Sequence, residues 1–182
     1  FSQKFPNISF SIHDVPNEKI IEKVQEGIFE IGICFEPQLS HQLIFQPLFK
    51  EDFVAVVPKH HLLAQHQKIT MAELCMHPFI TLQKPSIIRH VIEKYCLNNN
   101  LILDLKVECH QISSLSHFVA YGMGVTAIPR HFQQCIDVEQ NSILEISEGN
   151  VSLEFGILYR KDFELSNMSQ QFIELIGQHH FS

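Results

Sequence analysis

The sequence predicts an α/β fold in which helices alternate with strands that form a parallel sheet. Residues 115–130 show the pattern most clearly, because their first apolar residues recur at i, i+3 and i+4, the period of a helix with one buried face. Gly122 then ends the helix in the left-handed conformation that glycine adopts without a Cβ penalty, and Gly124 permits a tight return. The apolar run 125–128 is typical of a buried strand, and Pro129 ends it. Repetition of this alternation along the chain favours a parallel α/β sheet.

The composition allows one domain or two small lobes with a substantial core. The chain has 182 residues, of which 45% are hydrophobic and 18% are charged. These values are typical of globular proteins and exclude a disordered chain.

Turn residues and helix caps divide the first part of the chain into elements. Alternating apolar and polar residues over 8–12 predict a half-buried strand. Asn17 is expected to cap a helix over 18–26, which Gly27 closes. Apolar runs then predict three strands, with a polar turn at 50–52 between the last two: 28–35, 43–49 and 53–57.

Capping signals also order the second part of the chain. Thr70 and Glu73 have the spacing of a capping box, which predicts a short helix before a strand over 79–82. Ser86 is expected to cap a helix whose apolar residues keep helical period, and Ser166 is expected to cap the last amphipathic helix. The remaining elements are expected to be the strands 101–107, 125–128, 143–146 and 153–159, with a helical turn over 131–135.

The charge of the chain argues against several classes of partner. The formal net charge is −7 at pH 7, and Arg160–Lys161 is the one adjacent basic pair. Nucleic-acid binding needs a basic face, so we expect no DNA binding by this stretch alone. No apolar run approaches a membrane span, and the first residues do not resemble a signal peptide.

Five isolated cysteines favour reduced thiols in a cytoplasmic protein over a disulfide framework.

Four motifs along the chain together resemble the effector-binding domain of LysR-type transcriptional regulators. Residues 5–8 resemble the family's entry into its second strand, and 24–33 resemble its helix-to-strand segment L-x-x-G-x-x-D-(L/I), with Glu30 in place of the usual Asp. Residues 48–58 resemble the family's L-x-x-(E/D)-x-(L/F)-x-(L/V)-V-x-P segment. Residues 119–129 resemble V-A-x-G-x-G-(I/V)-x-x-(L/I)-P. Each motif is weak alone, but four in order cover nearly the whole chain.

The resemblance implies two Rossmann-like lobes joined by two crossing strands, as in type 2 periplasmic binding proteins. Lobe I is expected to comprise residues 1–76 and 155–182, and lobe II residues 77–154, with crossings near 74–79 and 148–155. By comparison with the family, the first strand of lobe I and an N-terminal winged helix-turn-helix domain are expected to be missing before Phe1.

The resemblance also implies that a small effector binds in the cleft between the lobes. Unpaired amide groups at two helix starts would favour an anionic effector. Each candidate also has a purely structural interpretation, as a helix cap or a wall residue. The expected effector-binding residues are Asn17, Phe35, Glu36, Pro85, Ser86, Ile87, Val125 and Thr126.

The expected function is therefore that of a ligand-sensing regulatory domain without enzymatic activity or cofactor. We expect a homodimer or tetramer that contacts DNA only through the missing N-terminal domain, and no membrane partner. A solute-binding protein of a transporter, which shares the two lobes, is the alternative.

Metal and redox chemistry are weaker hypotheses. The histidines at 60, 61 and 66, and the pair His131 and Cys135, do not form a recognised zinc pattern. A redox switch through Cys96 or Cys109 would lack the cysteine pair of the family's peroxide sensors. No nucleophile elbow or phosphate-binding loop supports a hydrolase.

Overall fold

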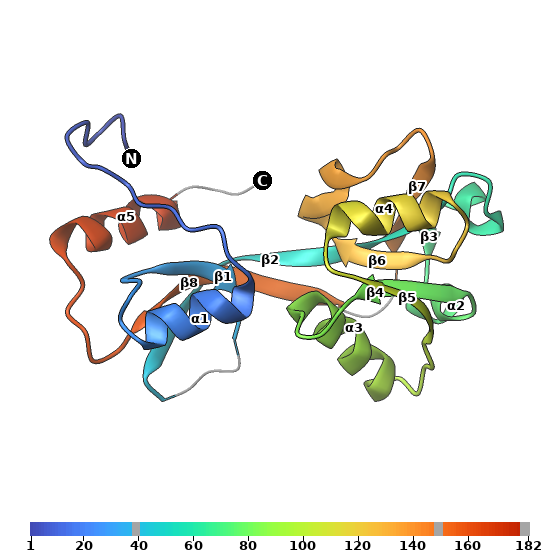
Figure 1. The fold of residues 1–182 in the computed structure, drawn as a ribbon, viewed down its shortest axis with the longest axis horizontal. Helices are drawn as coiled ribbons and strands as arrows, with labels where there is room; N and C mark the ends of the chain where they lie inside the picture. The colour runs from blue at the N-terminus through green and yellow to red at the C-terminus, as the bar shows by residue number, and fades with distance from the viewer. Residues whose placement is uncertain (38–40, 148–150, 179–182) are drawn as a thin grey trace. The chain divides into compact units, whose positions relative to one another are not determined.

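The computed structural model describes residues 1–37, 41–147 and 151–178, which form two compact units (Figure 1). Unit 1 comprises Phe1–Lys50 with Glu154–Ser182, and unit 2 comprises Glu51–Leu153. The elements in chain order are α1 (Asn17–Gln25), β1 (Gly32–Phe35), β2 (Leu43–Pro58), η1 (Leu62–Gln65), β3 (Lys68–Ile69), α2 (Met71–Cys75), β4 (Pro78–Leu82), α3 (Ile87–Asn98), β5 (Asp104–Cys109), α4 (Ile112–Ala120), β6 (Thr126–Pro129), η2 (Arg130–Cys135), β7 (Asn141–Ile146), β8 (Ser152–Arg160) and α5 (Asn167–Gln178).

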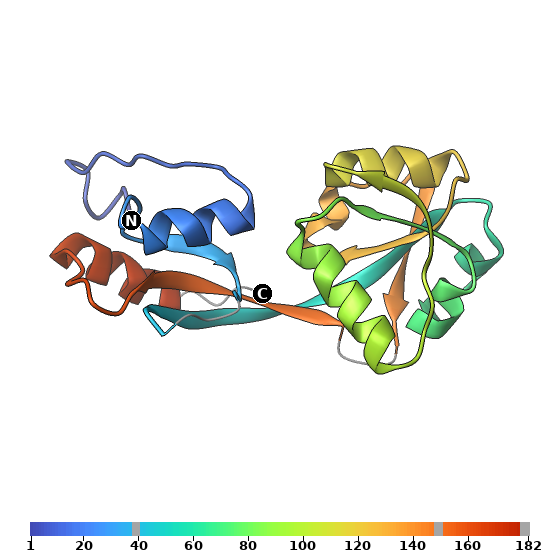
Figure 2. The same ribbon diagram turned by 60° about the horizontal axis from the view of Figure 1, so that its bottom comes forward.

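Unit 1 is built on a small antiparallel arrangement covered by α1. β1 pairs antiparallel with β8, and β8 lies beside β2. Figures 1 and 2 both show α1 lying along these strands. Its helical period brings apolar side chains onto one face, and this face joins the strands in a core that contains Val24, Cys34, Leu43 and Leu158.

Unit 2 contains most of the described sheet and helices. The second half of β2 pairs antiparallel with both β6 and β7, and β3 pairs parallel with β7. β4 and β5 pair in parallel, and a bridge between Phe79 and Val125 links β4 to the start of β6. α3 packs against β4 and β6, while α4 packs against β4 and β5. The residues at 53–57 are all buried, because β2 has neighbours on both sides here.

The expected first crossing between lobes at 74–79 is wrong. The chain passes from unit 1 to unit 2 at Lys50–Glu51, inside the single strand β2, so residues 51–76 belong to the second unit. The polar triplet 50–52 is not a turn, because Glu51 is buried and its carboxylate accepts a hydrogen bond from the backbone N–H of His131. The return crossing lies at Leu153–Glu154, inside the expected stretch, of which 148–150 lie outside the described residues.

Several strand predictions also need correction. The sheet is mixed and not parallel, because β2 and β8 each run antiparallel to neighbours. The expected strand at 8–12 forms no ladder with the described strands, and this segment instead lines a groove together with residues 28–33. The strand expected at 28–35 is confined to β1, and the strand expected at 101–107 begins later, as β5.

Three of the four predicted caps are confirmed. Thr70 and Glu73 form a complete capping box, and the side chains of Ser86 and Ser166 each accept a hydrogen bond from the backbone N–H three residues later. Gly122 adopts a φ of 72°, as expected for the end of α4. Asn17 is not a cap, because Pro16 occupies the N-cap position of α1 and Asn17 is the first residue of the helix.

Candidate functional site

The start of α3 presents backbone donors to its surroundings. Ser86 Oγ accepts from the N–H of Arg89 at 3.4 Å, and the carbonyl of Ser86 accepts from His90 at 2.9 Å. The amides of Ile87 and Ile88 lie in the first turn, where a helix supplies no acceptor of its own. These two N–H groups and the positive end of the helix dipole therefore suit a carboxylate or another small anion.

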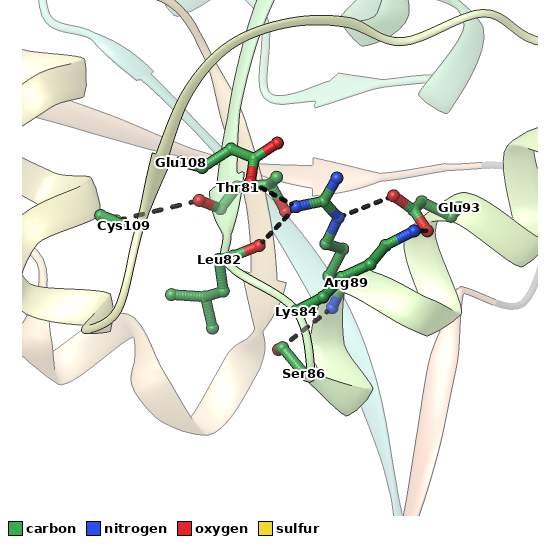
Figure 3. Close-up of polar contacts among 8 residues, drawn as sticks. All are labelled: Thr81, Leu82, Lys84, Ser86, Arg89, Glu93, Glu108 and Cys109. Atoms are coloured by element: carbon green, nitrogen blue, oxygen red, sulfur yellow. Dashed lines mark hydrogen bonds and ion pairs between the residues drawn. The ribbon is translucent and has the colours of Figure 1, made fainter.

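The buried side chain of Arg89 links the start of α3 to the strands β4 and β5 (Figure 3). The Arg89 side chain is 8% exposed, and its Nε donates to Glu93 Oε1 at 2.7 Å. One Nη lies 2.9 Å from Glu108 Oε2 on β5 and donates to the carbonyl of Leu82 at 3.2 Å. Lys84 Nζ reaches the other oxygen of Glu93 at 3.0 Å. The network joins the end of β4, the first two turns of α3, and β5.

The same contacts determine the ionisation of the cluster. Partial burial acts to raise the pKa of Glu93, but hydrogen bonds from Arg89 and Lys84 together outweigh it and hold that pKa below its ordinary value. The hydrogen bond to Glu108 raises the pKa of Arg89. The guanidinium is therefore charged and already committed to protein acceptors, and its role is to position the helix start.

The start of α1 offers a second set of donors, in unit 1. Asn17 Oδ1 accepts from the backbone N–H of Phe35 at 2.9 Å, which ties the first residue of α1 to the last residue of β1. Because an N–H must point at an oxygen, this bond fixes the orientation of the amide group. The Asn17 Nδ2 group therefore keeps two donors for a ligand.

Unit 1 brings together three of the predicted site residues. Besides the Asn17–Phe35 bond, the Phe35 ring packs on Phe155 with centroids 5.3 Å apart. Glu36 is exposed, and its N–H donates to the carbonyl of Glu154 at 2.7 Å. The carboxylate of Glu36 therefore adds negative charge at the same end of β1.

In unit 2, Pro85, Ser86 and Ile87 are consecutive at the start of α3, whereas Val125 directly precedes β6 and Thr126 is its first residue. Val125 and Thr126 are each 1% exposed. The parallel bridge from Val125 to Phe79 places them beside the beginning of β4, while α3 starts after its end. The hydroxyl of Thr126 has no hydrogen-bond partner in the described part of the chain. A ligand would reach these two residues only if the surrounding strands moved.

A separate apolar groove of about 960 Å³ lies within unit 1. One wall is the extended segment 8–15, and the opposite wall is formed by residues 28–33 and the first half of α5. Ile12 and Ile28, at its rim, are 87% and 61% exposed.

Metal and membrane interpretations receive no support from the described residues. Among residues 1–37, 41–147 and 151–178, no three His, Cys, Asp or Glu side chains gather as a metal site. No helix in these ranges is long and apolar enough to cross a membrane.

The sequence prediction missed Arg89. Its spacing to Glu93 is i, i+4, which predicts a helical ion pair but gives no sign of burial. The burial comes from Glu108 and Leu82, which lie on strands and are brought there by the fold.

Comparisons with known proteins agree with the two-unit architecture. A family model described as "LysR substrate binding domain" matches residues 1–180. The chain is 24% identical over 176 residues to the uncharacterized HTH-type transcriptional regulator YwbI of Bacillus subtilis, covering 96% of this chain and 58% of that protein. It is 19% identical over 180 residues to the HTH-type transcriptional activator CmpR of Synechocystis, covering 98% and 59%. The chain thus spans about three fifths of these relatives.

Solved structures show the same fold. The effector-binding domain of QuiR in complex with shikimate superposes with a TM-score of 0.84 at 20% identity, covering 96% of this chain and 82% of that one. The regulatory domain of CcmR from Synechocystis in complex with 2-PG superposes with a TM-score of 0.85 at 22% identity, covering 97% and 85%. The expected periplasmic-binding-protein-like fold is therefore confirmed.

Proposed function

Because the chain belongs to the LysR substrate-binding domain family, we propose that it is the effector-sensing part of a DNA-binding transcriptional regulator. The match over residues 1–180 is the observation that carries this proposal. The relatives found are named as transcriptional regulators, which favours this function over that of a transporter's solute-binding protein. In this role the protein would act in the cytoplasm and contact DNA through a domain outside this chain.

The effector is proposed to be a small molecule with an anionic group. Donors at the two helix starts support this proposal, namely the amides of Ile87 and Ile88 in unit 2 and the Asn17 Nδ2 group in unit 1. Glu36 lies near Asn17, and its charge disfavours a second anion there. We therefore propose the start of α3, within unit 2, as a site for an anionic group, and Asn17, within unit 1, as a donor to a hydroxyl or carbonyl group.

Assembly into a homodimer belongs to the same proposal. Among the described strands, β5 pairs with β4 alone, so its other edge is open to a neighbour. An isologous contact between two protomers would cover such edges in both copies at once.

A thermal-shift screen of small carboxylates, hydroxy acids and amino acids tests the proposal. We expect at least one anionic compound to raise the melting temperature of the parent chain in a concentration-dependent way. Ser86→Ala should weaken that binding about tenfold, which corresponds to roughly 1.4 kcal/mol. Ser166→Ala is the matched control, because it removes the same kind of cap from α5 and should leave binding unchanged.

Asn17→Asp separates the two roles of Asn17. The aspartate keeps an acceptor for the Phe35 N–H, but it replaces the Nδ2 donors with a negative charge. We expect a folded protein that loses the effector. If folded Ser86→Ala and Asn17→Asp proteins bind the effector as tightly as the parent, both residues are structural and the site lies elsewhere.

A further inference from the structure

Two cysteines on neighbouring helices of unit 2 lie in contact. The Sγ atom of Cys75, the last residue of α2, is 3.7 Å from the Sγ atom of Cys96 in α3. Cys96 is 3% exposed, whereas Cys75 is partly exposed and can be reached from solvent. The pairing is not visible in the sequence, because 21 positions separate the two residues.

We propose that Cys75 and Cys96 form a redox-active dithiol that closes to a disulfide on reaction with a hydroperoxide. Cys75 is the attacking residue because an oxidant can reach it, and Cys96 is the resolving residue because it is buried against Cys75. The partial exposure of Cys75 favours a small oxidant such as hydrogen peroxide over a bulky disulfide.

The reaction balances in two steps. The Cys75 thiolate attacks one peroxide oxygen, the O–O bond breaks, and the products are a Cys75 sulfenic acid and hydroxide. The Cys96 sulfur then attacks the Cys75 sulfur, the S–O bond breaks, and the leaving hydroxide takes up the Cys96 proton to form water. Two thiols are oxidised by two electrons in all, and the peroxide is reduced to water.

The electrostatics of the pair favour this assignment of roles. A hydrogen bond from the Cys96 thiol lowers the pKa of Cys75, against the opposing effect of burial. The same hydrogen bond, together with burial, raises the pKa of Cys96. Thiolate character is therefore concentrated on the accessible sulfur, which is the requirement for a reactive cysteine.

Closing the bond requires the two sulfur atoms to move closer together. A disulfide has a sulfur–sulfur distance of about 2.05 Å, so the two atoms must approach from 3.7 Å. Cys75 ends a helix of five residues and is followed by Met76, whose side chain is 81% exposed. We expect the movement to lie at this end of α2, because Cys96 is buried in α3.

Titration of the full chain with hydrogen peroxide, followed by thiol blocking and peptide mapping, tests the proposal. We expect a cross-linked peptide pair that contains Cys75 and Cys96, with the loss of two hydrogens, and its disappearance after treatment with dithiothreitol. The urea midpoint should rise on oxidation and return on reduction, since a cross-link restricts the unfolded chain.

Single variants identify the role of each sulfur. In Cys96→Ser, Cys75 should stop at the sulfenic acid, which a dimedone probe traps. In Cys75→Ser, Cys96 should stay a thiol. Cys135→Ser removes an exposed cysteine outside the pair and should leave the cross-link unchanged. Oxidation of Cys135 in the parent without any Cys75–Cys96 cross-link would overturn the proposal.

Discussion

Arg89 connects the proposed effector site to the stability of unit 2. Its guanidinium is buried, while its partners Glu93 and Glu108 are 29% and 45% exposed. Removal of the arginine would break charge-assisted hydrogen bonds and the packing of its stem, but water can reach the carboxylates that remain. The cost should therefore fall below that of breaking a fully buried ion pair.

We expect Arg89→Ala to lower the free energy of unfolding by about 2 kcal/mol. Glu108→Gln should cost less than about 1 kcal/mol, because its carboxylate is closer to solvent. Urea denaturation of both variants measures the difference. Equal stabilities of the Arg89→Ala and Glu108→Gln proteins would contradict the central role of Arg89 in the cluster.

His61 should make stability depend on pH. Partial burial, assisted by the nearby His77, lowers the pKa of His61, and the two rings lie 4.5 Å apart. The folded state therefore disfavours the protonated ring. Stability is complete above the unfolded pKa of about 6.5 and declines as the pH falls through that value toward the folded pKa.

This expectation is checked by measuring the urea midpoint at about pH 7.5 and at about pH 5.5, which lie on either side of the unfolded pKa. His61→Asn is the control, because asparagine can keep the cap that His61 provides to the Leu63 N–H but does not titrate. The loss of stability on acidification should be smaller in His61→Asn than in the parent. An identical loss in both proteins would show that His61 does not contribute.

At the scale of single residues, the sequence predicted correctly the side chains that form hydrogen bonds within their own helical turn. The caps at Thr70, Ser86 and Ser166 depend on a donor three residues away, so their spacing was sufficient. Asn17 and Arg89 could not be predicted correctly, because Phe35 lies 18 positions from Asn17 and Glu108 lies on another strand.

The segment from α4 to β6 depends on two glycines for different reasons. Gly122 has a positive φ with open space around it, whereas a Cβ on Gly124 would lie 2.4 Å from the carbonyl oxygen of Pro78. Gly124 thus lets β6 approach the start of β4, where the amide of Val125 donates to that same carbonyl at 2.8 Å.

We expect Gly124→Ala to destabilise the protein by about 1–3 kcal/mol, because a backbone group must move to admit the methyl group. Gly122→Ala should cost about 1 kcal/mol, which reflects its left-handed conformation alone. Chemical denaturation compares the two variants. A smaller loss for Gly124→Ala than for Gly122→Ala would show that the close approach can relax.

Helices and strands were predicted well where capping residues and apolar periodicity agree. They were predicted poorly where the pairing of one strand with another determines the structure. β2 was expected as two strands because residues 50–52 are polar, yet one strand runs through them, and the buried Glu51 accepts a hydrogen bond from the His131 N–H. The segment at 8–12 alternates like a strand but pairs with none of the described strands. Period alone cannot report whether a partner strand is present.

At the scale of the whole chain, the ordered motifs were sufficient to predict the family and its fold. The boundary between the units could not be predicted from the sequence, because β2 passes through both units and has no break at Lys50–Glu51. All eight expected effector-binding residues remain predictions, and two of them, Val125 and Thr126, are buried.

The charge distribution of the molecule leads to the final prediction, that this chain does not bind duplex DNA. The formal net charge is −7, and all three arginines already form ion pairs, Arg89 with Glu93 and Glu108, Arg130 with Glu145, and Arg160 with Asp162. Affinity for DNA depends on basic side chains that displace counterions from phosphates. Fluorescence anisotropy with a labelled duplex should show no binding at about 0.15 M salt, with a lysine-rich peptide as the positive control. Saturable binding that weakens steeply as salt increases would mean that basic side chains of this chain contact the phosphates, and that the domain itself takes part in DNA recognition.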